Sequence, residues 1–339
     1  MAGIQTVGVT QTQEEVIGTF PVPYKGVHRD QSEVEIGRDS LWIGENLHLF
    51  EGELRQRPSW NLARNATVAA PPAAAGSITT PWSTRRAGTR NEFLMVGGTK
   101  EVHIMGSSGW IRVQPWAATR NRWQQVRFTD IATGTPLATN VCVVNGVDSM
   151  LRAVLPSSGN PSADFGTFVT AAPVMRDICT ASDRVVGITE TEVRWTSALD
   201  VTTWPALATK SLAETLDLCV AIRPLTTLNV GVWKERSLWI GQFAGGTDAA
   251  AFRWRVLRMV DGPASPNALC TDSLGNWFWM TKLGRVIQMD ENYQITTPGD
   301  GIWPIVRTQM SQVQNEYGQS HATYRPFYDE VWFFYGGLP

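Results

Sequence analysis

The chain has 339 residues and a formal net charge of −2, with 43% hydrophobic and 18% charged residues. This composition is typical of a globular protein with a sizeable core, in one large all-β domain or two smaller domains. A nearly balanced charge does not give the broad basic surface that tight nucleic-acid binding requires, so we do not expect such binding. The fifteen tryptophans are far above the usual share, and each could contribute about 5 kcal/mol when buried, before costs. We therefore expect aromatic layers in the core.

The first 38 residues carry no hairpin pattern, and they lack the basic and apolar runs of a signal peptide or a membrane span. We expect residues 1–38 to form an extended arm whose stiffest point is FPVPYKG, residues 20–26. Residues 39–339 form the second predicted region. The pentapeptide SLWIG occurs in this region twice, at 40–44 and 237–241, which is a first sign of a repeated unit.

A strand–turn–strand unit recurs along residues 39–339. Its most regular marker is a cysteine in the middle of the first strand, at steps of 37, 40 and 51 residues, in Cys142, Cys179, Cys219 and Cys270. Leu94 in EFLMVGG and Tyr324 in ATYRPF take the same place in two further hairpins. The period and the six hairpins predict an all-β fold, a single β-propeller of about six blades.

We expect Leu94 and the four cysteines to lie on the innermost strands of their blades, where strands crowd and small side chains fit. The cysteines form no CxxC or CxxH pair, so we expect separate, reduced thiols, with no metal and no cofactor. A hairpin at about residues 40–58 is expected to close the propeller by pairing with the last strands, around EVWFFYG at 330–336. Residues 305–318 are the best helical candidate.

Three stretches stand out, VRWTSALDVTTWP, GENLHLFEGELRQRPSW and VWKERSLWIGQF. Together they resemble β-propeller virion proteins of tailed bacteriophages. The first is VRWTSALDVTTWP, in which the matching residues are Trp195, Ser197, Asp200 and Trp204. The second is GENLHLFEGELRQRPSW, in which Asn46, Gly52, Leu54, Arg57 and Pro58 fall in place and Ser59 replaces the usual glycine. The third is VWKERSLWIGQF, similar to a strand of that family that carries a glutamate, here Glu235, and an aromatic residue.

The resemblance implies a non-enzymatic structural subunit of the phage tail or neck, such as a nozzle or hub ring around the DNA channel. Its expected partners are further copies of itself in a ring, with sixfold symmetry favoured, and other tail or neck proteins. Contact with phage DNA would be transient at most, and no membrane segment is expected. The expected location is the virion, after synthesis in the host cytoplasm.

The alternative is a propeller that binds or hydrolyses glycans, because propellers also host glycosidases with paired carboxylates. The candidate carboxylates are Asp183, Glu190, Glu192, Glu235, Asp272 and Asp290, most of them in predicted turns. Trp195 and Trp204 could form a sugar platform, although a pair of tryptophans more often packs one blade against the next. The isolated histidines, His28, His48, His103 and His321, do not have the spacing of metal ligands. A basic cluster, Arg85, Arg86 and Arg90, could face a partner subunit or DNA or simply be solvated.

Overall fold

The computed structural model divides into two compact units, Met1–Asn61 and Leu62–Pro339. It describes residues 47–50, 53–56, 78–85, 92–98, 101–106, 109–115, 123–130, 138–155, 166–301, 303–312, 320–326 and 329–334. In the first unit, β1 (Leu47–Phe50) and β2 (Glu53–Gln56) pair antiparallel, with Leu47 opposite Gln56. This hairpin lies within the segment predicted to form one.

The second unit contains five four-stranded antiparallel sheets among its described residues. The first consists of β3 (Ile78–Arg85), β4 (Glu92–Gly98), β5 (Glu101–Gly106) and β6 (Gly109–Pro115). The second consists of β7 (Gln124–Asp130), β8 (Ala138–Val144), β9 (Leu151–Leu155) and β10 (Gly166–Phe168). The third consists of β11 (Asp177–Ala181), β12 (Arg184–Ile188), β13 (Glu192–Trp195) and β14 (Thr209–Ser211).

The fourth sheet consists of β15 (Cys219–Pro224), β16 (Asn229–Lys234), β17 (Ser237–Phe243) and β18 (Phe252–Met259). The fifth consists of β19 (Leu269–Thr271), β20 (Trp277–Met280), β21 (Val286–Met289) and β22 (Ile295–Thr296). A two-stranded sheet, β23 (His321–Arg325) with β24 (Glu330–Phe334), follows. In every four-stranded sheet the strands stand side by side in chain order, as they do in the blades of a propeller.

Within the described part of the chain, two short helices interrupt the strands. The 3₁₀ turn η2 (Asp248–Ala250) lies between β17 and β18, and the helix α1 (Trp303–Gln312) follows β22. The predicted helix is confirmed as far as Gln312. Pro304 occupies the start of α1, where a helix needs no backbone N–H donor.

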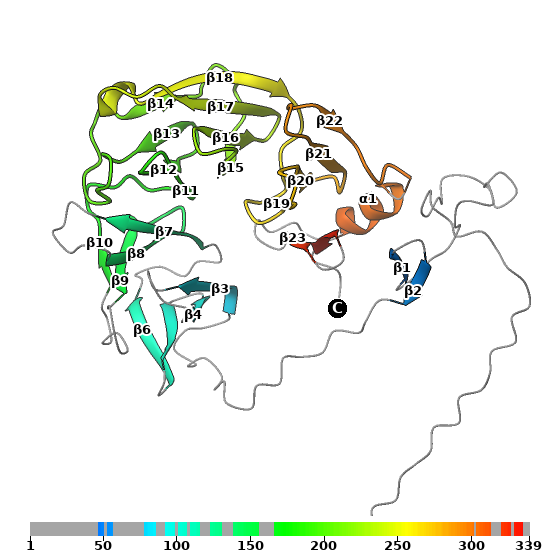
Figure 1. The fold of residues 1–339 in the computed structure, drawn as a ribbon, viewed down its shortest axis with the longest axis horizontal. Helices are drawn as coiled ribbons and strands as arrows, with labels where there is room; N and C mark the ends of the chain where they lie inside the picture. The colour runs from blue at the N-terminus through cyan, green and yellow to red at the C-terminus, as the bar shows by residue number, and fades with distance from the viewer. Residues whose placement is uncertain are drawn as a thin grey trace, which may run out of the picture. The chain divides into compact units, whose positions relative to one another are not determined.

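The first strands of successive sheets lie next to one another within the second unit. β7 lies beside β11, β11 beside β15, and β19 beside β23 (Figure 1). At the start of β7, the Gln124 side chain donates a hydrogen bond of 2.9 Å to the Asn267 side chain, just before β19. The two residues are 143 positions apart in the sequence, so the first strands of non-adjacent sheets approach one another. The all-β prediction is confirmed, and the arrangement is propeller-like.

The residues expected on the first, innermost strands divide between the first and second strands of their sheets. Cys179, Cys219 and Cys270 lie in the first strands β11, β15 and β19. Leu94 and Cys142 instead lie in the second strands β4 and β8. The first strands of those two sheets read ITTPWSTR and QQVRFTD. Because both are polar and one contains a proline, hydrophobicity does not reveal them.

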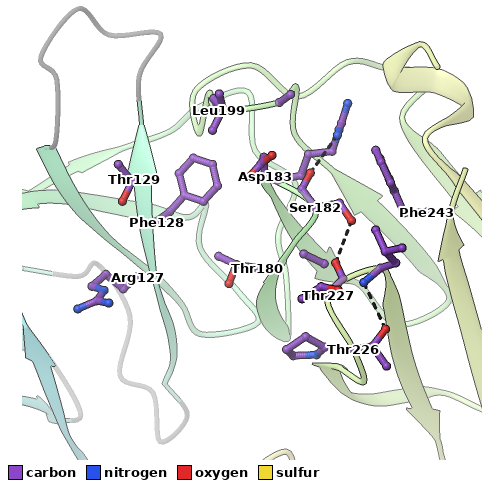
Figure 2. Close-up of a pocket in the computed structure, with 15 residues that line it drawn as sticks. Arg127, Phe128, Thr129, Thr180, Ser182, Asp183, Leu199, Thr226, Thr227 and Phe243 are labelled. Carbon is purple, nitrogen blue, oxygen red and sulfur yellow. Dashed lines mark hydrogen bonds between the residues drawn. The ribbon is translucent and has the colours of Figure 1, made fainter. Parts of the chain in front are cut away.

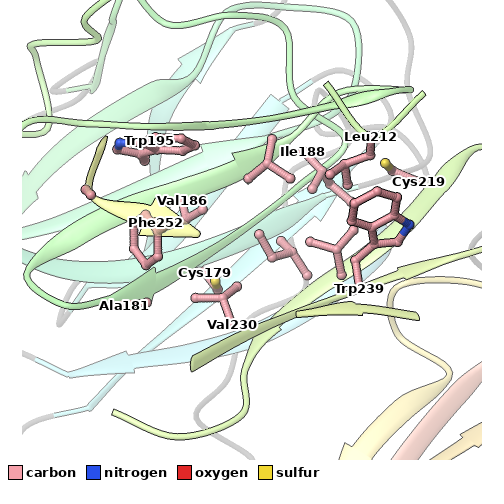
Figure 3. Close-up of a cluster of buried hydrophobic side chains, with 14 of the residues drawn as sticks. Cys179, Ala181, Val186, Ile188, Trp195, Leu212, Cys219, Val230, Trp239 and Phe252 are labelled. Atoms are coloured by element: carbon pink, nitrogen blue, oxygen red, sulfur yellow. The ribbon is translucent and has the colours of Figure 1, made fainter. Parts of the chain in front are cut away.

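Each described boundary between neighbouring four-stranded sheets is filled by an apolar cluster. Trp123 belongs to the cluster between the first and second sheets, and Trp204 packs on the one between the second and third. Trp195 and Trp239 lie between the third and fourth sheets (Figure 3). Trp233 and Trp279 lie between the fourth and fifth. The inner strands of the sheets between two such clusters are therefore buried on both faces, and the expectation of aromatic layers is confirmed.

The second SLWIG copy shows how one strand supplies two clusters. Leu238 packs toward the fifth sheet, and the next residue, Trp239, packs toward the third. Gly241 lies under the indole of Trp254 in the neighbouring strand, 2.5 Å from where a Cβ atom would be. The glycine that ends this pentapeptide is therefore required by packing. The first copy lies outside the described residues.

The four cysteines are free thiols. Cys142, Cys179 and Cys219 are buried, and Cys270 is partly exposed. Burial raises the pKa of Cys219 to about 12 and also raises that of Cys179, because it disfavours the thiolate.

We expect Gly241→Ala to lower the free energy of unfolding by about 1–3 kcal/mol, because the added methyl group must displace the Trp254 indole. Urea denaturation measures the change. In a Trp254→Leu background the same alanine should cost much less. Equal costs in the two backgrounds would show that the indole is not what excludes a side chain at position 241.

We expect a disulfide-exchange reagent to react first with Cys270 in the folded protein, because the other three thiols are buried. Cys142, Cys179 and Cys219 should react only when the protein unfolds. Timed labelling followed by peptide mass spectrometry identifies the order. Rapid labelling of Cys219 in the native protein, or a native disulfide, would contradict the packing described above.

Candidate functional site

The motif residues Trp195 and Ser197 fasten the third sheet to the fourth. The Trp195 indole N–H donates to the backbone carbonyl of Asp248 at 2.6 Å, and the Ser197 hydroxyl donates to the Asp248 carboxylate, also at 2.6 Å. Arg184 from β12 donates to the other oxygen of the same carboxylate at 2.9 Å. Three side chains of the third sheet thus hold one residue of η2, which belongs to the fourth.

Asp200 and Trp204 build the loop that follows β13. One Asp200 carboxylate oxygen accepts bonds from the Thr202 backbone N–H at 2.8 Å and from the Thr202 hydroxyl at 2.7 Å. The Trp204 indole donates to the carbonyl of Val201 at 3.1 Å, while its ring packs on the cluster between the second and third sheets. All four residues of this motif are therefore engaged in packing or turn formation.

Hydrogen bonding lowers the pKa of two carboxyl groups in this region. For Asp248, the bond from Ser197 has the largest effect and Arg184 adds to it. For Asp200, partial burial acts in the opposite direction but is outweighed by bonds from Thr203 and Thr202. Both groups are therefore held as carboxylates.

Asp177 joins three sheets and was not predicted from the sequence. It is fully buried in β11, and its carboxylate accepts the Ile222 N–H of β15 at 2.9 Å and an Arg223 guanidinium N–H at 2.5 Å. Burial raises the pKa of Asp177, and the charge of Arg223 opposes this rise. The same guanidinium donates to the Pro266 carbonyl, ahead of β19, at 2.6 Å. The available sequence signal is a charged residue inside each apolar strand, in RDICTA and VAIRPL.

Lys234, in VWKER, is a second charged group that sequence reasoning missed. Its side chain is fully buried, and its ammonium group donates to the Leu212 carbonyl at 2.8 Å and to the Thr215 carbonyl and hydroxyl at 2.7 Å each. The Asp217 carboxylate lies 3.3 Å from it. A buried ammonium with all three protons donated acts as a cross-link between the third and fourth sheets.

A groove of about 1040 Å³ opens beside the first hairpins of the second, third and fourth sheets (Figure 2). Its lining includes the hydroxyls of Thr129, Thr180 and Ser182 and one carboxylate, that of Asp183. Ser182 and Asp183 have φ angles of 48° and 58°, as a two-residue turn between antiparallel strands requires. The Ser182 hydroxyl donates to the Thr227 carbonyl at 3.3 Å, which ties this turn to the next sheet.

The structure does not gather the other candidate carboxylates at this groove. Glu190 pairs with Arg176, Glu192 with Arg194 at 3.1 Å, and the motif residue Glu235 with Lys282 at 2.6 Å. Asp272 and Asp290 each accept backbone N–H bonds within their own turns. A hydrolytic pair would need two carboxylates facing one cavity, and the lining of this groove contains one.

The remaining candidates are dispersed. His103 is buried beside Glu101, with 3.3 Å between its Nε2 and the carboxylate, and His321 is exposed on β23. No three His, Cys, Asp or Glu residues of the described segments are grouped to hold a metal ion. Leu54 and His48 lie in β2 and β1, and Arg85 ends β3. The candidates outside the described residues are His28, Asn46, Gly52, Arg57, Pro58, Arg86 and Arg90.

No protein-family model matches the chain, and no curated protein matches it. Among solved structures, the extracellular domain of a protein assigned as a hybrid two-component system from B. thetaiotaomicron is 8% identical, over 86% of this chain and 36% of its own, with a TM-score of 0.49. A Bacteroides uniformis protein assigned as a 6-phosphogluconolactonase is 13% identical, over 62% of this chain and 68% of its own, with a TM-score of 0.43. A chain of the nidogen/laminin complex is 11% identical, over 62% of this chain and 76% of its own, with a TM-score of 0.38. Similarity at this level assigns no function.

We expect Ser197→Ala to lower the free energy of unfolding by about 1 kcal/mol near pH 7, because it removes a charge-assisted bond to Asp248. The folded-state pKa of Asp248 is below the ordinary value of 3.8. Its stabilising effect is therefore complete above pH 3.8 and is lost as the pH falls through the lower, folded-state value. The difference between variant and parent in urea denaturation should accordingly shrink in acid. Ser211→Ala, at an exposed position on β14, serves as the control.

We expect Asp177→Ala to lower the free energy of unfolding by about 3–5 kcal/mol, because it leaves the Arg223 guanidinium without its buried carboxylate. Asp183→Asn, in the exposed turn of the same hairpin, should change it by less than about 0.5 kcal/mol, because asparagine tolerates the φ of 58° at that position. Chemical denaturation of both variants provides the comparison. Similar losses in the two would rule out the proposed role of the buried pair.

Proposed function

We propose that this chain is a structural subunit of a tailed-phage virion, in the tail or neck, that assembles into a symmetric ring around the DNA channel. The observation that carries the proposal is the role, in this structure, of the stretch that resembles phage propeller proteins. Trp195 and Ser197 hold Asp248 of the next sheet, and Asp200 and Trp204 shape the connecting loop. These residues fix the relative placement of sheets, which is what an assembly subunit requires.

The distribution of charged groups supports the same proposal. Asp177, Arg223 and Lys234 are engaged between sheets, and the candidate carboxylates of the glycosidase alternative do not converge. No helix of the described segments is long and apolar enough to cross a membrane. Buried polar groups that serve as cross-links hold the sheets in fixed relative positions, as an assembly subunit needs.

We further propose that the chain forms a six-bladed propeller, with five blades in the second unit and a sixth blade shared by the two ends of the chain. Five sheets have four strands each, whereas β1–β2 and β23–β24 have two each. Joined edge to edge, these two hairpins would make one blade of the same size as the others and would cover edges that otherwise invite aggregation.

A chain that begins at Leu62 should therefore be aggregation-prone, because it lacks the hairpin that completes the sixth blade. Adding residues 40–61 as a separate peptide during refolding should restore monodisperse protein, as measured by light scattering. A peptide with the same residues in scrambled order is the control. If the truncated chain is soluble and as stable as the full chain, the shared blade does not exist.

Cryo-electron microscopy of phage particles tests the functional proposal. We expect the chain in a closed ring on the tail axis, with sixfold symmetry favoured, and we expect the purified protein to form the same ring. Particles that lack the chain should have incomplete tails or necks. Finding the chain as single copies at the tip of a fibre would overturn the proposal.

The groove favours glycan binding as a second candidate function, because hydroxyl groups and the ring of Phe243 line one open cavity. Arg127 and Thr180 lie in its wall. A glycan array with the purified protein examines this candidate, with a variant carrying Arg127→Ala and Thr180→Val as the comparison. Binding that this variant loses, in a protein absent from tail rings, would favour the second candidate over the first.

A further inference from the structure

The outer edge of the fourth sheet is formed by a long strand with two different faces. β18 is the last strand of its sheet and pairs only with β17 among the described strands. Phe252 and Trp254 point to the cluster shared with the third sheet, where Trp254 stacks on Trp195 with ring centroids 6.5 Å apart. Arg253 and Arg255, which alternate with them, are exposed and lie on the opposite face.

These arginines carry charge that the rest of the described structure does not neutralise. Arg253, Arg255 and Arg258 have no ion pair or side-chain hydrogen bond with any described residue. Other arginines of the same region do: Arg184 and Arg194 each pair with a carboxylate. The strand therefore presents open backbone N–H and C=O groups beside a row of guanidinium groups, which suit carboxylates.

The complementary pattern occurs in the chain itself. Residues 32–36 read SEVEI, so that Glu33 and Glu35 alternate with Val34 and Ile36. In an extended strand, alternate residues share a face and repeat at about 6.6 Å, the same repeat as that of Arg253 and Arg255. Paired with β18, such a segment would place its two carboxylates beside the two guanidinium groups. Its Val34 and Ile36 would then lie on the side of Trp254.

We propose that β18 accepts residues 32–36 of a neighbouring copy as an added strand, and that this exchange links successive subunits. The proposal rests on the ring assembly proposed above. Head-to-tail contacts of this kind form a closed ring when the rotation from one subunit to the next is a whole fraction of 360°. The backbone ladder supplies affinity and the alternating charges supply register. Since the charge pairs are at the surface, the contact weakens as salt screens them.

Charge reversal in the full-length protein tests this pairing. Arg253→Glu with Arg255→Glu, and separately Glu33→Arg with Glu35→Arg, should each weaken self-association at least tenfold in sedimentation velocity at 0.1 M salt. A chain that carries all four substitutions should associate as the parent does. Arg194→Glu with Lys282→Glu changes the net charge by the same amount as the arginine reversal and is the control, expected to behave like the parent. Thermal unfolding of each variant verifies that it is folded.

Several results would overturn the inference. A parent protein that stays monomeric, reversed variants that associate like the parent, or a fourfold variant that stays dissociated would each do so. If reversing the arginines causes aggregation, they protect the edge against pairing, and the inference is wrong. A virion ring in which β18 is uncovered would overturn it too, while leaving the proposed function intact. If self-association depends on these charges but the protein is absent from virions, the strand exchange is supported and the proposed function is overturned.

Discussion

Burial of both sheet faces is the constraint on which the rest of this structure depends. The third and fourth sheets each lie between two apolar clusters, so their inner strands, such as β12, β16 and β17, have almost no face left for water, whereas the outer strand β18 remains largely exposed. The inner strands must then be apolar at successive positions, as SLWIG is, instead of alternating. Polar groups inside such a stack need partners within it, and Asp177 and Lys234 find theirs in neighbouring sheets. Burial of both sheet faces therefore explains both the tryptophans packed between the sheets and the buried charges that link neighbouring sheets.

The sequence was sufficient for the fold class and for much of the repeat, because apolar runs separated by turn residues are a local signal. Cys179, Cys219 and Cys270 marked the first strands correctly. Leu94 and Cys142 did not, because the polar strands β3 and β7 are held by pairing with the strands that follow them. A strand that is stabilised mainly by pairing with its neighbour does not need a strand-like pattern in its own residues, so the sequence does not reveal it.

The motif stretch around Trp195 could be located from the sequence, but its partner could not. Asp248 lies 51 residues beyond Ser197, in a stretch of Gly, Thr, Asp and Ala that reads as an ordinary loop. The same limit applies to the pair formed by Asp177 and Arg223, whose residues are 46 positions apart. Contacts at such separations depend on how sheets are stacked, and a single sequence does not encode that stacking in a local pattern. The groove is a product of stacking as well, because three sheets contribute to its wall.

The bond between Gln124 and Asn267 has a consequence for the proposed ring around a DNA channel. Because β7 and the segment before β19 approach within 2.9 Å through these two side chains, the middle of the unit is too narrow for a duplex whose major groove alone is about 12 Å wide. A conduit would have to be walled by the outsides of several copies. The diameter of this conduit would then be set by the number of copies in the ring. Substitutions that widen or narrow the conduit would lie on outer strands and loops.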